Sequence, residues 1–148
     1  MLVQKLNKIR AEKEAGDRGF TLIELLVVVV IIGILIAIAI PLYLNYQKGA
    51  KDKSSQSDLR GAVSAYEQCY TENGNAYPTD AVGTTNTASY TVTCGTSSEQ
   101  VNLSNGTSLK YVSADGTSFV ITAWNSGGHK NSAGTGYTYN SSTGGSVG

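Results

Sequence analysis

The chain has 148 residues, enough for one domain of ordinary size, and its 11 basic and 11 acidic residues leave no net formal charge. Residues 1–19 carry a net charge of +2, and the remainder of the chain carries −2. Neither part is basic enough to indicate nucleic-acid binding from charge alone, so we expect no nucleic acid as a partner of the monomer.

Residues 1–19 are charged and lack apolar periodicity, which is typical of a leader rather than of a folded element. An ordinary secretory signal has its apolar region before the cleavage site. Here the apolar region follows Gly19, so cleavage after Gly19 would leave the membrane segment on the mature protein. We therefore expect residues 1–19 to be a cleaved leader.

A long apolar helix is predicted after the leader. Residues 25–40 contain no polar side chain. The 23 residues from Leu22 to Leu44 would extend about 34 Å as a helix, enough for a bilayer core of about 30 Å. Basic residues lie on both sides of this run, and their distribution favours an N-terminus in the cytoplasm. Pro41 removes a backbone donor and predicts a kink.

Glu24 lies at the start of the apolar run. A charged side chain at the centre of a membrane helix costs roughly 2.5–3.5 kcal/mol on insertion scales, so an acid here indicates a function if a partner exists. Cleavage after Gly19 would create such a partner, the new amine on Phe20. The alternative is an interfacial acid whose side chain extends to the lipid headgroups.

The helical pattern continues from about Phe20 to about Glu72, a length of roughly 80 Å. From residue 49 it becomes amphipathic, with apolar residues three or four positions apart. These are Leu59, Ala62, Val63, Tyr66, Cys69 and Tyr70. We expect residues 20–48 to lie in lipid or against other helices, and helix 49–72 to carry a folded head that extends to residue 148.

The composition changes after Tyr77-Pro78, because 42 of the 70 residues from 79 to 148 are Ser, Thr, Asn or Gly. This favours strands and turns over further helix. After a loop over 73–89, an antiparallel sheet of three or four strands is predicted within 90–140, with strands at 90–94, 109–113, 118–124 and 137–139. Asp115-Gly116 is the strongest hairpin signal, and residues 141–148 are predicted to form a loose tail. The expected fold is α+β, with the long helix packed on this small sheet.

Cys69 and Cys94 are the two cysteines of the chain. A disulfide between them would stabilise the fold by about 3 kcal/mol in the chain-entropy model. The alternative is two separate thiols. Their spacing is neither Cys-x-x-Cys nor a zinc pattern, which favours the disulfide. A disulfide in a small domain beyond a membrane segment fits an oxidising compartment.

No catalytic arrangement, cofactor motif or metal site is predicted. His129, the single histidine, has no acidic or cysteine neighbour in the sequence, which favours a surface-loop residue over a ligand or base. The acids after residue 79 are too scattered to predict a calcium site: Asp80, Glu99 and Asp115.

A family resemblance rests on the sequence Gly19-Phe20-Thr21-Leu22-Ile23-Glu24-Leu25, the apolar run that follows and Pro41. This region resembles the N-terminal signature of type IV pilins and related pseudopilins. The resemblance covers about residues 18–48, where cleavage site, acid, apolar length and proline all occur at the expected offsets. The rest of the chain is similar only in architecture.

The resemblance implies roles for four residues. A membrane-embedded prepilin peptidase would cut between Gly19 and Phe20 and would N-methylate Phe20. Glu24 would pair with the new N-terminus of a neighbouring subunit and so set the register of assembly. Pro41 would mark the part of the helix that loosens in the filament.

We therefore expect a structural protein and not an enzyme: a major-type pilin that a membrane assembly platform polymerises into a filament of identical subunits. Before assembly it would span the cytoplasmic membrane once, in contact with lipid and with its N-terminus in the cytoplasm. Afterwards it would form an extracellular pilus. The alternatives are a pseudopilin of a type II secretion or DNA-uptake system, and a membrane-anchored surface-binding protein that does not polymerise.

Overall fold

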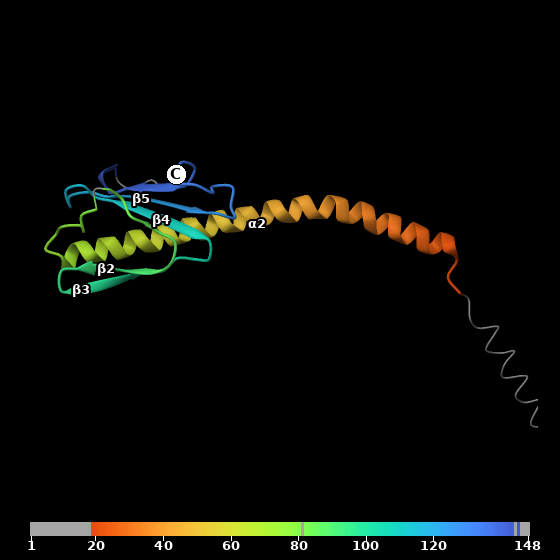
Figure 1. Ribbon diagram of the computed structural model, residues 1–148, viewed down its shortest axis with the longest axis horizontal. Coiled ribbons are helices and arrows are strands. Elements are labelled where there is room, and N and C mark those ends of the chain that lie inside the picture. The colour runs from red at the N-terminus through yellow and green to blue at the C-terminus, as the bar shows by residue number, and fades with distance from the viewer. Residues whose placement is uncertain (1–18, 81, 144, 146–148) are drawn as a thin grey trace, which may run out of the picture. The chain divides into compact units, whose positions relative to one another are not determined.

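The computed structural model describes residues 19–80, 82–143 and 145. Its main element is the helix α2 (Leu22–Glu72), which continues through Pro41 without interruption (Figure 1). The remaining elements are short antiparallel strands, so the predicted α+β class is confirmed. The chain divides into two compact units, one ending at Leu42 and one comprising Tyr43–Gly148.

The first unit contains the apolar half of α2. Its large hydrophobic side chains are all exposed, from Leu22 through Ile40. By length and composition α2 can cross a membrane, and none of its most apolar window is buried within the chain. This half of the helix therefore has the surface of an element that lipid or other helices cover.

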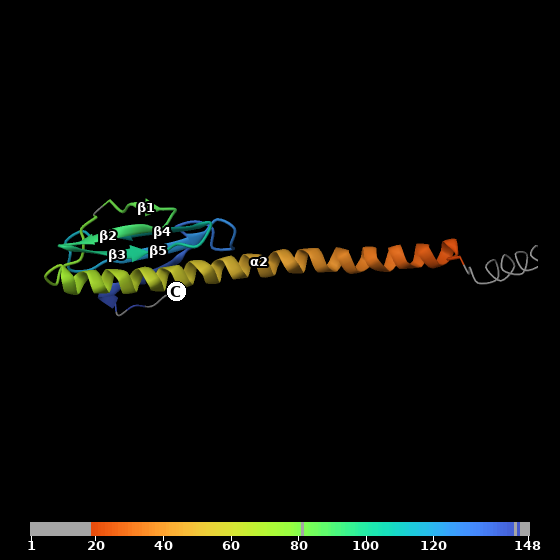
Figure 2. The same ribbon diagram turned by 90° about the horizontal axis from the view of Figure 1, so that it is seen from below.

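The second unit is a head built on the other half of α2. Residues three or four positions apart form a buried stripe on this half of the helix, comprising Leu59, Ala62, Ala65, Tyr66 and Cys69. The strands labelled in Figure 2 lie on one side of this half of the helix. The predicted amphipathic segment is thus the platform on which the head is packed.

A four-stranded antiparallel sheet packs residues of its two central strands into the head's core. Its spatial order is β1 (Thr85–Asn86), β4 (Thr107–Val112), β5 (Val120–Asn125) and β6 (Tyr137–Asn140). The β4–β5 pairing aligns Val112 with Val120, on either side of the turn that contains Asp115-Gly116. Gly116 has φ +73°, a conformation that a side chain would strain. Ser141–Thr143 then forms the short 3₁₀ helix η1.

A separate two-stranded sheet corrects the prediction of one sheet. β2 (Tyr90–Cys94) pairs with β3 (Ser97–Val101), and neither strand belongs to the ladder of the larger sheet. Two strands were absent from the prediction, β3 and β1. β3 carries one buried hydrophobic residue, Val101, while β1 has only two residues, so neither shows a clear alternating pattern.

Aromatic rings join the helix to the larger sheet. The Phe119 ring lies within 6 Å, centroid to centroid, of four tyrosine rings: Tyr66, Tyr77, Tyr111 and Tyr139. Tyr66 of α2 stacks on Tyr111 of β4 with ring centroids 3.9 Å apart. Such pairs add to the energy of area burial, so this cluster is the centre of the head's core.

A disulfide between Cys69 and Cys94 links α2 to β2, with Cα atoms 5.0 Å apart and both residues fully buried. Ser97 also donates a hydrogen bond to the Glu72 carboxylate at the end of α2. Since the β2–β3 hairpin shares no backbone ladder with the larger sheet, these links and its side-chain packing hold it on the head.

We predict that replacing both cysteines by serine lowers the free energy of unfolding of the head by about 3 kcal/mol, because the unfolded chain gains the freedom of an open loop. Urea unfolding of the full-length chain in detergent, followed by Trp124 fluorescence, measures this change. Reductant should produce the same loss in the unchanged chain and none in the double variant. Equal stability of the oxidised chain and the variant would contradict the prediction.

Candidate functional site

The first described residues place the predicted cleavage junction in an open position. Gly19 and Phe20 precede the helix, and the Phe20 side chain is 83% exposed. A Cβ atom added at Gly19 would meet no atom within 4 Å. Packing within the described chain therefore gives no reason for a glycine at this position. The predicted leader, residues 1–18, lies outside the described residues.

Thr21 and Glu24 form a reciprocal cap at the start of α2. The Glu24 N–H donates to the Thr21 hydroxyl oxygen at 3.3 Å, and the Thr21 backbone N–H donates to Glu24 Oε2 at 2.8 Å. The Thr21 hydroxyl also donates to Oε2 at 2.8 Å. This is the capping-box arrangement, which satisfies backbone donors that the first helical turn leaves without partners. The same contacts give the carboxylate hydrogen bonds within its own chain.

The cap leaves one side of the Glu24 carboxylate available. All three cap contacts involve Oε2 or the Thr21 hydroxyl, and within the described chain no donor is recorded on Oε1. A carboxylate has about four acceptor sites on its two oxygens, so it can accept a further charged donor without losing the cap. Thr21 and Glu24 both follow the predicted cut, so cleavage would not remove either partner.

The apolar half of α2 continues directly from this cap. Small residues interrupt its branched side chains at Gly33, Ala37 and Ala39, and nothing lies within 4 Å of a Cβ added at Gly33. Small residues allow membrane helices to approach closely. Pro41 lies inside the helix and cannot donate the usual backbone hydrogen bond to the carbonyl of Ala37.

A second cluster lies in the head, where a loop binds the helix at Asp52. The backbone N–H groups of His129 and Lys130 donate to the two oxygens of the Asp52 carboxylate, at 3.2 and 3.0 Å. His129 Nδ1 lies 3.0 Å from Asp52 Oδ2, and His129 Nε2 lies 2.8 Å from Asn45 Oδ1. We call these three residues and Asn45 the loop clasp.

The geometry of the loop clasp leaves little space. The Asp52 side chain is 11% exposed, whereas the His129 side chain is 50% exposed. A Cβ added at Gly128 would collide with the Asp52 carboxylate, so the close approach of this loop requires glycine. The clasp therefore fixes the 126–130 loop on α2 at the edge of the head.

The clasp also determines the protonation of Asp52. Burial raises the pKa of the Asp52 carboxyl, but hydrogen bonds from Lys130 and His129 and the attraction of the His129 ring lower it. The hydrogen bonds and this attraction together outweigh burial, so the pKa lies below its ordinary value. Asp52 is thus a charged acceptor at neutral pH.

Sequence reasoning missed this contact because 77 residues separate Asp52 from His129. His129 does lie in a loop, as expected, but an acid from the helix contacts it in space. The pair gives no metal site, since within the described ranges no three His, Cys, Asp or Glu side chains gather as a metal ion requires. We read the clasp as a structural contact.

Comparisons with known proteins agree with the N-terminal features. The family described as the prokaryotic N-terminal methylation motif matches residues 15–40. The type IV wide pilus major component PilA4 of Thermus thermophilus is 36% identical over 75% of this chain and 76% of its own length. The type IV narrow pilus major component PilA5 of the same organism is 30% identical over 60% of this chain and 88% of its own length.

Other relatives match a shorter region. The type IV major pilin protein PilA of Myxococcus xanthus is 45% identical over 38% of this chain, and the chain covers 26% of that protein. The chain thus spans only about a quarter of the length of this relative. No solved structure matches the chain closely enough for comparison.

We predict that Asp52→Asn destabilises the head by about 1–3 kcal/mol, because an amide offers one acceptor oxygen to donors that now share two. Urea unfolding of the full-length chain in detergent measures the loss. Glu99→Gln, a partly exposed acid-to-amide change on β3, is the matched control and should have little effect.

The effect of Asp52→Asn should depend on pH. The folded pKa of Asp52 is depressed, so its stabilisation is fully present above its unfolded value of about 3.9 and is lost as pH falls through the folded pKa. The difference between the unchanged chain and the variant should therefore be constant near neutral pH and shrink below about pH 4. A constant difference down to pH 2 would contradict this assignment.

Proposed function

This chain belongs to the type IV pilin family, and we propose that it is a major-type pilin, the repeated structural subunit of a type IV pilus-like filament. The observation that carries this proposal is the exposed apolar half of α2, which begins at a capped carboxylate and has no covering partner in the described chain. Copies of the same helix would cover it in a filament core. The head, rich in Ser, Thr, Asn and Gly, would form the outer surface.

Processing would prepare the subunit for assembly. A prepilin peptidase would cut between Gly19 and Phe20, remove residues 1–19 and N-methylate Phe20. The exposed junction and the match to a methylation motif support this step. The new amine would remain basic after methylation and would lie close in sequence to Glu24.

Assembly would pair charges between neighbouring subunits. The N-terminal amine of one subunit would donate to the Glu24 carboxylate of another, using the Oε1 side that the cap leaves available. A wrong stagger would leave both charges unpaired among apolar helices, and an uncompensated buried charge costs about 3–5 kcal/mol. Glu24 would therefore select the register of the filament more than it would add net stability.

The membrane would hold the subunit before assembly. We place the precursor across the cytoplasmic membrane once, with its N-terminus in the cytoplasm and its head outside, where the Cys69–Cys94 disulfide fits an oxidising environment. A membrane assembly platform would then transfer the helix from lipid to the bundle, where Pro41 would allow it to loosen. Packing and paired charges would compensate for the lost lipid contacts.

We predict that Gly19→Leu blocks processing, because a branched side chain obstructs a backbone held extended in a peptidase. The measurement is the mass of the chain in membrane fractions, which should remain that of the full precursor. Gly134→Leu, the same change at a glycine where an added Cβ meets no atom within 4 Å, is the control and should still be processed. Recovery of Gly19→Leu at mature mass would refute the assigned cut.

We predict that Glu24→Gln is cleaved normally but lowers the yield of surface filaments by about tenfold or more, given the cost of one unpaired buried charge. Glutamine keeps a side-chain oxygen for the Thr21 cap and removes only the charge. Glu24→Ala should lower the yield similarly. Immunoblots of sheared filaments and of membranes separate assembly from processing.

The result for Glu24→Gln distinguishes register pairing from capping. Abundant filaments from Glu24→Gln together with few from Glu24→Ala would show that Glu24 acts through the cap alone. Long extracellular filaments of the unchanged chain support the pilin. A short fibre confined to the envelope would indicate the pseudopilin instead, and recovery from membranes only would indicate an anchored protein that does not polymerise.

A further inference from the structure

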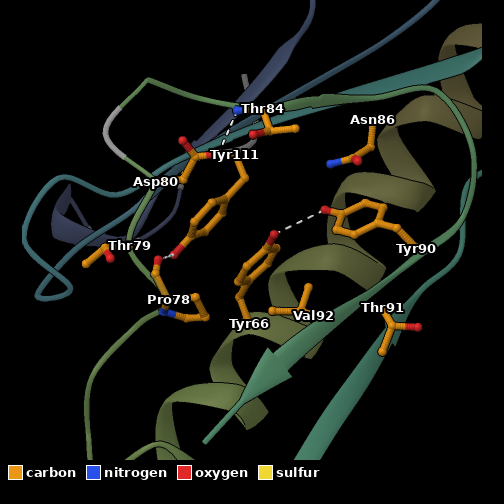
Figure 3. Close-up of a pocket in the computed structure, with 10 residues that line it drawn as sticks. All are labelled: Tyr66, Pro78, Thr79, Asp80, Thr84, Asn86, Tyr90, Thr91, Val92 and Tyr111. Carbon is orange, nitrogen blue, oxygen red and sulfur yellow. Dashed lines mark hydrogen bonds between the residues drawn. The ribbon is translucent and has the colours of Figure 1, made fainter.

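A pocket of about 250 Å³ lies in the head, where the hairpin strand β2 faces β1 and the segment before it (Figure 3). It opens between the two sheets, which share no backbone ladder. Ten residues line it: Tyr66, Pro78, Thr79, Asp80, Thr84, Asn86, Tyr90, Thr91, Val92 and Tyr111. Its volume lies just below the range of about 300–1,000 Å³ typical of drug-sized ligands, so it suits one small ring.

Two tyrosine hydroxyls meet at this pocket. The hydroxyl oxygens of Tyr66 and Tyr90 are 3.2 Å apart, and either can donate to the other. Each hydroxyl has one proton, so a pair that shares one hydrogen bond retains a second proton for another acceptor. Burial raises the pKa of Tyr66 and of Tyr90, so both hydroxyls remain neutral donors at physiological pH.

The wall behind this pair is rigid. The Tyr111 ring stacks on Tyr66, and the Tyr111 hydroxyl donates to the Pro78 carbonyl at 2.7 Å. Burial raises the pKa of Tyr111 to about 12. Tyr66 is only 4% exposed, and its ring also contacts the Phe119 cluster. The aromatic wall is thus part of the core, and its position is set before any ligand arrives.

Polar groups also line the pocket. Asp80 accepts hydrogen bonds from the backbone N–H groups of Gly83 and Thr84, at 2.8 and 2.7 Å, and the bonds with Thr84 and Gly83 lower its pKa. Figure 3 shows the Asn86 amide on the same side of the pocket as Tyr90. The carboxylate supplies acceptors, and the amide supplies both donors and an acceptor.

These lining groups exclude several ligand classes. Asp80 is the one charged residue among the ten, so an anion would meet repulsion without a counter-charge. One carboxylate also supplies fewer charged ligands than a site for a hard metal ion normally has. The hydroxyls and amide would lose hydrogen bonds to water on contact with a purely apolar ligand.

We propose that this pocket binds one neutral monosaccharide ring, either free or at the end of a glycan. Such a ring presents hydroxyls around its edge, which match Asp80, Asn86 and the Tyr66–Tyr90 pair. Its C–H faces match the carbon surfaces of Tyr90 and Pro78. This site lies wholly in the head and does not require the chain to polymerise, so it is tested independently of the filament proposal.

The test is saturation-transfer NMR on the full-length chain in a zwitterionic detergent without a sugar headgroup. The probes are the methyl glycosides of glucose, galactose, mannose, N-acetylglucosamine and N-acetylgalactosamine, which represent glycan ends, together with the five free sugars. Glucuronic acid represents anions. We expect transfer to at least one neutral sugar and none to glucuronic acid, with protein-free micelles as the blank.

Two variants locate the site. Tyr90→Phe removes one hydroxyl of the pair and keeps the ring, and Asn86→Leu removes the amide at a partly exposed position. Each should weaken binding about fivefold to tenfold, as expected for the loss of one or two hydrogen bonds. Tyr137→Phe is the matched control, because Tyr137 lies on β6 outside the lining, and it should bind as the unchanged chain does.

The outcomes decide the proposal. Binding of a methyl glycoside indicates that the ligand is the end of a glycan. Binding of only the free sugars indicates that the ligand is a free monosaccharide. Either result supports the site. Absence of transfer to all ten neutral probes would overturn it. So would binding that Tyr90→Phe and Asn86→Leu leave unchanged, or equal transfer to glucuronic acid. The Trp124 fluorescence spectrum checks that each variant keeps a native head.

Discussion

The structure depends on one constraint: half of a single helix exposes apolar side chains that the chain itself does not cover. In water such a surface is unfavourable, whereas in lipid or in a bundle of similar helices it is not. The other half of α2 faces the opposite requirement, because it must leave the apolar environment and carry a folded head. The composition follows this division, with a purely apolar segment first and an amphipathic one after it.

The head is attached to α2 by polar contacts on either side of a narrow apolar stripe. Four acids along the helix each accept a hydrogen bond from a different part of the head: Asp52 from the His129 loop, Asp58 from Ser104, Glu67 from Tyr77 and Glu72 from Ser97. Exposed contacts of this kind each contribute little to the free energy of unfolding, whereas those at buried Asp52 contribute more. With the disulfide near the end of the helix, they explain how a head so poor in large apolar residues keeps a defined position on a single stripe.

The sequence predicted the parts of the fold that depend on local patterns. The extent of α2 follows from a long apolar run and a stripe with helical spacing, and the β4–β5 hairpin follows from Asp115-Gly116 between alternating strands. β3 was missed because four of its five residues are polar, and its place is set by pairing with β2. The clasp was missed because no local pattern relates Asp52 to His129. The cap was predictable from the sequence, because Thr21-x-x-Glu24 fits the capping-box pattern. From the sequence we instead assigned the charge of Glu24 to a partner on another subunit.

That cap changes how an acid at the edge of an apolar helix should be understood. Without it, Glu24 would carry an unsatisfied carboxylate in the membrane, and pairing would have to offset the whole cost of burial. With it, Oε2 already accepts two donors from Thr21, so the residue is partly satisfied in the isolated subunit. Because Oε1 remains available, a charged donor from another copy would add to these contacts instead of replacing them. In the proposed filament, a correct stagger would pair the amine with Glu24 and a wrong stagger would leave the charges unpaired. The energy difference between these two states would select the register, and the helix cap would not have to break first.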